Sequence, residues 1–198
     1  MSHPLVRLYP GPLAHVTLSG RYLSHDLRQF GEPGRPFVYA NFLVSLDGRA
    51  AAPHPETGRW GVPAAIANDR DWRLYMELAA QADVLLTSDK LLQAVASGRH
   101  SELLDLGQEG LEDLVQWRRH RGLLGQPVVA AVSRGLRIPA GGLGGHFPGE
   151  VLVLTTERAP AGRARELEQA GIEVVRAGPG PDLTAEEITR ALTDRGHT

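Results

Sequence analysis

Asp47 is the polar residue best placed to act on a bound ligand. It lies in Ser45-Leu46-Asp47-Gly48, a stretch with turn chemistry that directly follows an apolar run, and Gly48 can adopt a positive φ there. The carboxylate could accept a hydrogen bond from a ring nitrogen or an amide of a substrate, or it could simply close its own turn. We predict Asp47 as the catalytic residue and keep turn closure as the alternative.

Asn41 and Trp60 are the candidate substrate contacts. Asn41 lies within an apolar run, where an unpaired amide would cost about 1–3 kcal/mol, so it either meets a partner in the core or faces a ligand cavity. Trp60 lies in a loop rich in proline and glycine, where a tryptophan is better suited to a lid or a stacking surface than to the core. We predict that both residues bind substrate.

Hydroxyl and charged side chains follow three further apolar runs that we predict to be strands. Hydroxyls and backbone N–H groups at a helix N-terminus, with an arginine nearby, suit a phosphate or a ribose 2′-phosphate. Capping of the next helix by the same hydroxyls is the alternative. The residues in these positions, predicted to bind a cofactor, are Thr87, Ser88, Ser133, Arg134, Thr155 and Thr156.

Several kinds of chemistry have no residues to support them. The sequence has no cysteine, which excludes thiol nucleophiles, disulfides and zinc–thiolate sites, and Lys90 is its one lysine. The eight histidines show no metal-ligand spacing, so we expect no metal site. Gly-x-Ser-x-Gly is absent, as is Gly-x-Gly-x-x-Gly after the first predicted strand. The glycine-rich stretch Gly141–Gly145 precedes a strand and is predicted to be a loop.

The composition predicts one folded domain with no electrostatic case for binding nucleic acid or an anionic membrane. The chain has 198 residues, of which 42% are hydrophobic, and a formal net charge of −2 at pH 7. That charge gives no support for binding to nucleic acid or to an anionic membrane. No stretch approaches the ~20 apolar residues of a membrane helix. We therefore expect a cytoplasmic protein whose partners include neither nucleic acid nor membrane.

Strands and helices are predicted to alternate from residue 36 onwards, after an N-terminal arm over residues 1–35 that either packs on the domain or is flexible. The alternation predicts an α/β fold with a mainly parallel sheet covered on both faces and with ligands beyond the carboxyl ends of the strands. The predicted strands are Pro36–Val44, Val84–Thr87, Val128–Val132, Val151–Leu154 and Ile172–Val175. The predicted helices follow Asn68 and the capping box of Thr184 and Glu187, and cover Lys90–Ala96, Leu111–His120 and Arg163–Ala170.

The run from Arg35 to Ala50, RPFVYANFLVSLDGRA, resembles the opening strand and S-L-D-G turn of the riboflavin-biosynthesis pyrimidine reductase domain. That domain is the C-terminal part of the bifunctional deaminase–reductase. Trp60, the helix that begins Asp69-Arg70-Asp71-Trp72 and the strand in Ala82–Ser88 continue the match in order. The resemblance implies a three-layer α-β-α, dihydrofolate-reductase-like fold over residues 36–198.

The resemblance also implies NADPH as the cofactor, a pyrimidine- or pterin-like ring as the substrate, and a homodimer. The implied activity is related to that of 5-amino-6-(5-phosphoribosylamino)uracil reductase. Val44 and Ser45 would line the nicotinamide, with Gly48 in the adjoining turn, and Trp60 would contact cofactor or substrate. The hydroxyl and arginine residues after the three later strands would hold the phosphates and riboses.

Members of that family continue beyond the position of Thr198 with a further strand, a glycine loop that clasps the cofactor pyrophosphate, and closing strands. We therefore expect this chain to lack those elements. A non-catalytic, truncated module for assembly or ligand binding is the alternative to an NADPH-dependent reductase. A third hypothesis is a flavodoxin-type nucleotide-binding protein, which a bound flavin would colour.

Overall fold

The computed structural model describes residues 5–56, 58, 60–63, 65–98, 104–143 and 147–197. The chain divides into two compact units. The first unit comprises Met1–Asp26 and Val38–Leu78, and the second comprises Leu27–Phe37 and Ala79–Thr198. Most of the predicted N-terminal arm is thus in the first unit, while its last residues belong with the second.

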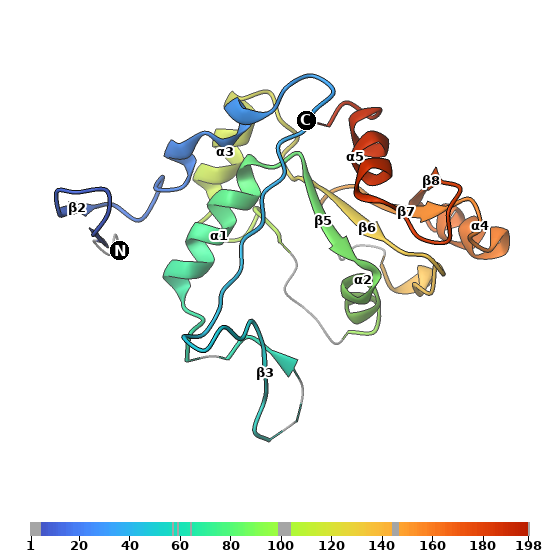
Figure 1. The fold of residues 1–198 in the computed structure, drawn as a ribbon, viewed down its shortest axis with the longest axis horizontal. Helices are drawn as coiled ribbons and strands as arrows, with labels where there is room; N and C mark the ends of the chain where they lie inside the picture. The colour runs from blue at the N-terminus through green and yellow to red at the C-terminus, as the bar shows by residue number, and fades with distance from the viewer. Residues whose placement is uncertain are drawn as a thin grey trace. The chain divides into compact units, whose positions relative to one another are not determined.

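The second unit is built on a four-stranded parallel sheet in the order β5-β6-β7-β8. Consecutive strands of the chain are neighbours in the sheet, and all three pairs are parallel (Figure 1). Four of the five predicted strands are thereby confirmed, with small changes at their ends. The strands are β5 (Val84–Ser88), β6 (Val128–Val132), β7 (Val151–Thr156) and β8 (Glu173–Gly178).

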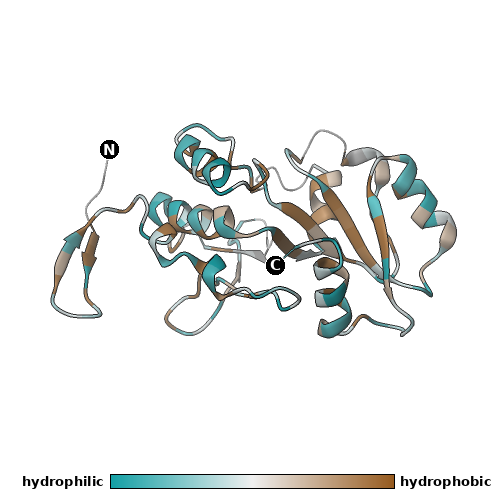
Figure 2. Ribbon diagram, turned by 90° about the horizontal axis from the view of Figure 1, so that it is seen from above, coloured by the Kyte–Doolittle hydropathy of each residue, from teal (hydrophilic) through white to brown (hydrophobic). Residues whose placement is uncertain are grey.

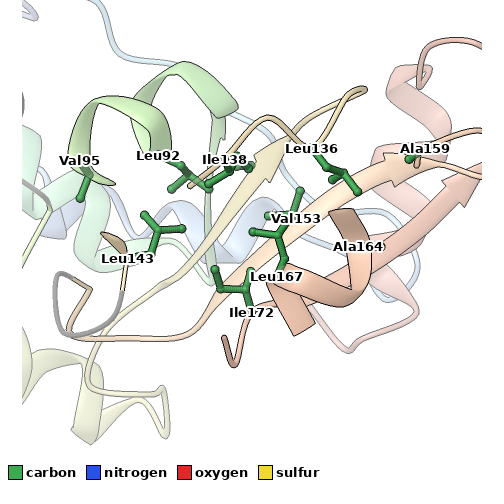
Figure 3. Close-up of a cluster of buried hydrophobic side chains, with 11 residues drawn as sticks. Leu92, Val95, Leu136, Ile138, Leu143, Val153, Ala159, Ala164, Leu167 and Ile172 are labelled. Atoms are coloured by element: carbon green, nitrogen blue, oxygen red, sulfur yellow. The ribbon is translucent and has the colours of Figure 1, made fainter. Parts of the chain in front are cut away.

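Helices cover both faces of this sheet. On one face, α2 (Asp89–Ala96) and α4 (Ala161–Gln169) bury Leu92 and Leu167 in a cluster with Val153 of the central strand β7 (Figure 3). On the other face, α5 (Ala185–Thr193) packs Ala191 against alternate residues of β6, β7 and β8. Figure 2 shows the strands between these helices as the most hydrophobic part of the second unit. The predicted α/β fold with a covered parallel sheet is confirmed.

Capping interactions set the ends of two helices. At α5, the Thr184 hydroxyl accepts from the Glu187 N–H at 3.2 Å and the Glu187 carboxylate accepts from the Thr184 N–H at 2.8 Å, so the predicted capping box is confirmed. At α1 (Asp69–Gln81), the Asn68 side-chain oxygen accepts from the N–H groups of Arg70 and Asp71.

A buried arginine holds the C-terminal end of α1 in the second unit. Arg118 of α3 (Glu112–His120) is 1% exposed, and its guanidinium donates to the carbonyls of Ala80 at 2.9 Å, Ala82 at 2.7 Å and Leu124 at 2.6 Å. The last carbonyls of a helix lack helical donors and carry its negative partial charge. A cation placed there donates hydrogen bonds to these carbonyls and compensates the negative partial charge of the helix end.

The first unit is organised around the buried carboxylate of Glu77 on α1. This carboxylate accepts from the backbone N–H groups of Gly20 at 2.5 Å and Tyr22 at 2.7 Å, and from Arg73 at 3.0 Å. These bonds hold the N-terminal segment on the helix, so that part of the predicted arm is packed.

The remaining elements are β1 (Leu5–Arg7), β2 (Ala14–Val16), η1 (Leu23–His25), β3 (Ala52–Pro53) and β4 (Trp60–Gly61) in the first unit, and η2 (Leu27–Phe30) and η3 (Ala140–Gly142) in the second.

The strand predicted at Pro36–Val44 is wrong. Residues 36–45 form no helix or strand, and Phe42 is 74% exposed. Within the first unit, this segment is held by a hydrogen bond from the Tyr39 hydroxyl to the Leu78 carbonyl at 2.7 Å. An apolar run becomes a strand only where a neighbouring strand takes up its peptide groups, and the described residues supply none for this run.

Among the described residues, we find no helix with the length and apolar character that crossing a membrane requires.

Arg118→Met should lower the free energy of unfolding by about 2–4 kcal/mol, because it removes the donor to three main-chain carbonyls in a buried position. Urea unfolding followed by circular dichroism measures the change. Arg119→Met is the matched control, since Arg119 is the next residue of the same helix and is exposed, and it should stay within about 0.5 kcal/mol of the wild type. Equal losses in the two variants would contradict the capping role of Arg118.

Candidate functional site

The candidate site residues of the second unit lie at the carboxyl edge of the sheet. Parallel pairing brings the ends of β5, β6 and β7 to the same edge, which is where ligands bind in open α/β sheets. The structure therefore brings together six of the predicted cofactor contacts on three neighbouring strands. They are Thr87 and Ser88 on β5, Ser133 and Arg134 after β6, and Thr155 and Thr156 on β7.

Thr155 and Thr156 are buried at the end of β7 with unused hydroxyls. They are 0% and 1% exposed, and among the described residues neither Oγ1 has a hydrogen-bond partner. The ladder to β8 shifts register between these two residues. Their backbone is held from β8, where the Arg176 guanidinium donates to the carbonyls of Thr156 at 3.2 Å and Glu157 at 3.0 Å. The main chain is thus fixed while two hydroxyls keep free hydrogen-bonding capacity.

Ser133 is engaged by the protein itself. Its hydroxyl donates to the Asp89 carboxylate at 2.8 Å and accepts from the Leu136 N–H at 3.1 Å. Asp89 is the first residue of α2, so the bond ties the start of that helix to the end of β6. Leu136 is fully buried at a φ of 51°, a conformation that the bond from its N–H helps to hold. Ser133 therefore has a structural role that the sequence pattern does not reveal.

Arg134 forms an ion pair with Asp182, a residue beyond β8. The guanidinium and carboxylate are 2.8 Å apart, and both side chains are mostly exposed. An exposed pair of this kind contributes about 0–1 kcal/mol, so a phosphate could displace the carboxylate at little cost. Arg134 remains able to bind an anion.

Thr87 and Ser88 show how β5 passes into α2. Ser88 takes the N-cap position with extended backbone angles, but its side chain makes no capping hydrogen bond. Thr87 is half-buried and Ser88 is exposed. The capping alternative thus does not account for the Ser88 hydroxyl, and cofactor binding by these two residues stays a prediction.

Asp47 closes its own turn in the first unit. Its carboxylate accepts from the Ser45 hydroxyl and pairs with Arg49 at 3.1 Å, while the Gly48 N–H donates to the Ser45 carbonyl at 2.8 Å. Gly48 has a φ of 81°, which a residue with a side chain adopts only at a cost. The observed contacts of Asp47 are those expected if it closes its own turn. Catalysis by Asp47 stays a prediction.

The other first-unit candidates are Asn41, Val44 and Trp60. Asn41 and Val44 are exposed, so the amide of Asn41 does not sit in a core. The backbone of Trp60 belongs to β4, where it pairs with Pro53 of β3, but its side chain lies outside the described part of the structure. Substrate binding by Asn41 and Trp60 and cofactor binding by Val44, Ser45 and Gly48 stay predictions.

The structure adds three side chains that the sequence patterns did not single out at the carboxyl edge. Asp89, Arg176 and Asp182 each contact a predicted site residue or its backbone. Of these, Asp89 had a local signal, since it directly follows Ser88 at a predicted strand end. The partners of Arg176 and Asp182 are distant in the chain, and no local pattern marks them.

Among the described residues, Tyr75 and Glu112 have clearly shifted pKa values, and neither belongs to the predicted site. Burial raises the pKa of the Tyr75 phenol on α1 above its ordinary value. Hydrogen bonds from the backbone N–H groups of Glu112 and Gly110 lower the pKa of the Glu112 carboxyl. Among the described residues, no group of three or more His, Asp or Glu side chains could hold a metal ion.

An open depression of about 490 Å³ lies along α5, and none of the predicted site residues lines it. It is shallow and lined by the exposed side of one helix together with Gly34. Its lining residues are Gly34, Ala185, Glu186, Thr189, Arg190, Thr193 and Asp194. The depression does not overlap the carboxyl edge, and we assign no function to it.

Comparison of the sequence with family models and with curated proteins finds no match. The structure, in contrast, matches a pyrimidine reductase-like protein from Corynebacterium diphtheriae with a TM-score of 0.54 and 20% sequence identity. The chain shares the fold of that protein. The match covers 79% of this chain and 60% of the other, so this chain spans well under two thirds of that protein's length. The dihydrofolate-reductase-like fold implied by the sequence resemblance is confirmed.

Ser133→Ala should lower the free energy of unfolding by about 1–2 kcal/mol, because it leaves the Asp89 carboxylate and the buried Leu136 N–H without their partner. Thermal or urea unfolding of the ligand-free protein measures this loss. Ser88→Ala is the matched control and should change stability by less than about 0.5 kcal/mol, since its side chain makes no capping bond. An unchanged stability in Ser133→Ala would refute the structural role of the hydroxyl.

Proposed function

We propose that this protein binds NADPH at the carboxyl edge of the second unit's sheet and acts as a reductase of a pyrimidine- or pterin-like ring. The observation that carries the proposal is the pair of buried hydroxyls on Thr155 and Thr156 that have no partner among the described residues. The fold supports it, because the similar solved protein is described as pyrimidine reductase-like.

An unpartnered buried hydroxyl costs about 1–3 kcal/mol, so a fold that keeps two at one strand end gains if a ligand satisfies them. Ribose hydroxyls and phosphate oxygens are suitable partners. Each Oγ1 has less than 1 Å² of accessible area, so a ligand reaches it only when the protein atoms around it are displaced. Such a small displacement on binding is common at ligand sites formed by loops.

Positive charge near this edge favours an anionic cofactor. The Arg134 guanidinium is mostly exposed and is engaged only in a surface ion pair. Arg158 lies two residues after the end of β7 and donates through Nε to the Pro179 carbonyl at 3.1 Å, and its guanidinium has further N–H donors for other acceptors. An arginine can bind a phosphate through two parallel hydrogen bonds. These two side chains would hold the phosphates of the dinucleotide.

When bound, NADPH supplies a hydride, and the protein supplies position and a dry environment. In this proposal Thr155 and Thr156 bind the dinucleotide, and Arg134 orients its phosphates. In the first unit, cofactor binding by Val44 and Ser45 and proton donation by Asp47 stay predictions.

NADPH titration of the purified protein, followed by nicotinamide fluorescence, tests the proposal. Thr155→Val and Thr156→Val should each weaken NADPH binding at least about fivefold, because valine has the shape of threonine but no hydroxyl. The same variants should be as stable as the wild type or slightly more so, since each removes an unpartnered buried polar group.

Thr193→Val is the matched control. Thr193 also carries a buried hydroxyl without a described partner, but it lies on α5 near Arg195, which contacts Glu173 at the amino end of β8. Its replacement should have the same small effect on stability and none on NADPH affinity. No binding of NADPH by the wild type at millimolar concentration, or unchanged affinity in both β7 variants, would overturn the proposal.

A further inference from the structure

Two arginines at the carboxyl edge are held by one short segment of the second unit. The Arg134 guanidinium pairs with the Asp182 carboxylate at 2.8 Å, and Arg158 donates to the Pro179 carbonyl at 3.1 Å. Pro179 and Asp182 belong to the connection between β8 and α5. The oxygen atoms of this connection therefore occupy N–H donors that an anionic ligand at the same edge would need.

The ion pair between Arg134 and Asp182 crosses the end of β7. Arg134 lies two residues after the end of β6 and Asp182 four residues after the end of β8, and β7 lies between these two strands. Neighbouring strands are about 4.8 Å apart, so the pair bridges two strand spacings. It thus spans the strand end that carries Thr155 and Thr156, which is where we propose that the cofactor binds.

Asp182 contributes little to holding its own connection in place. The N-terminus of α5 is capped by Thr184 and Glu187. In the part of the chain that the structure describes, the Asp182 carboxylate is bonded to Arg134 alone. The two side chains are 70% exposed for Arg134 and 68% exposed for Asp182, and an exposed pair of this kind adds little stability. The carboxylate can therefore leave the guanidinium by rotation of its side chain, while α5 keeps its cap.

We propose that Asp182 is an internal competitor for the anion that Arg134 binds. Its carboxylate occupies the guanidinium, and a phosphate of the ligand takes its place on binding. One described hydrogen bond, from Nη1 of Arg134 to Oδ1 of Asp182, joins the pair, whereas a phosphate can accept two parallel bonds from a guanidinium. The inference rests on the phosphate contact proposed for Arg134 and does not depend on which substrate the protein reduces.

The strength of the ion pair limits the size of this effect. A ligand that displaces the carboxylate must make up for the lost pair, and an exposed pair is worth a factor of about five in affinity at most. Removal of the carboxylate should therefore strengthen anion binding, although it takes away the partner of a site residue. A carboxylate that positions Arg134 for the ligand would give the opposite result.

Isothermal titration calorimetry of the full chain with NADPH and with inorganic pyrophosphate tests the proposal. At 0.15 M salt, Asp182→Asn should bind both probes about three- to fivefold more tightly than the wild type, and Arg134→Gln should bind both more weakly. Glu168→Gln is the matched control, because it removes the same charge from an exposed residue of α4 that belongs to no predicted site. Its affinities should stay within about 1.5-fold of the wild type, since salt screens distant surface charges.

A double-mutant cycle separates direct competition from a general effect of charge. In Arg134→Gln the Asp182 carboxylate has no guanidinium to occupy, so the further change Asp182→Asn should leave the affinity for both probes unchanged. An equal gain from Asp182→Asn with and without the guanidinium would overturn the proposal. So would a loss of affinity in Asp182→Asn, which would mean that the carboxylate positions Arg134.

The two probes distinguish failure of this inference from failure of the proposed function. Pyrophosphate binding that Asp182→Asn strengthens, in a protein that does not bind NADPH, would support the competition and refute the proposed cofactor. NADPH binding that Arg134→Gln weakens and Asp182→Asn leaves unchanged would refute the competition alone. No binding of either probe at millimolar concentration would overturn both.

Discussion

Parallel pairing of β5, β6, β7 and β8 is the constraint on which the rest of the second unit depends. A parallel neighbour can be reached only by a crossover, so the chain must return across a face of the sheet after each strand. These returns place α2 and α4 on one face, and α5 then closes the other. The same geometry collects the ends of successive strands at one edge. The polar residues that follow the strands therefore become neighbours, although the chain separates them by 20 residues or more.

Polar groups in the interior are treated in two different ways. Two buried charged side chains are engaged, since Glu77 accepts from backbone donors and Arg73, and the guanidinium of Arg118 donates to three carbonyls. This is expected, because a buried charge without partners costs far more than a neutral group. The hydroxyls of Thr155 and Thr156 have no such engagement. Glu77 and Arg118 therefore contribute to the stability of the fold, whereas the hydroxyls of Thr155 and Thr156 keep hydrogen-bonding capacity that a ligand could use.

The sequence was sufficient for elements whose signals are local. The four strands of the sheet are short apolar runs ended by turn residues, and the capping box at Thr184 and Glu187 is contained within four residues. The segment from Pro36 to Val44 has an equally strong local pattern but no strand beside it, and pairing depends on the rest of the molecule. The role of Ser133 was invisible for the same reason, because its partner Asp89 lies 44 residues earlier. Local patterns locate polar residues at strand ends and cannot tell which of them the protein itself engages.

Position decides what an unsatisfied hydroxyl means. Thr193 lacks a described partner just as Thr155 and Thr156 do, so the missing bond alone does not indicate a ligand. Thr193 lies on α5, where it lines the open depression with Thr189 and Arg190 and not the carboxyl edge of the sheet. Thr155 and Thr156 end a central strand, with the exposed guanidinium of Arg134 following the strand beside them. A dinucleotide requires hydroxyl or amide donors together with positive charge, and the carboxyl edge combines the hydroxyls of Thr155 and Thr156 with the guanidinium of Arg134 where ligands bind in open α/β sheets. The case for a cofactor site therefore rests on the coincidence of two features that the sheet topology brings to one place.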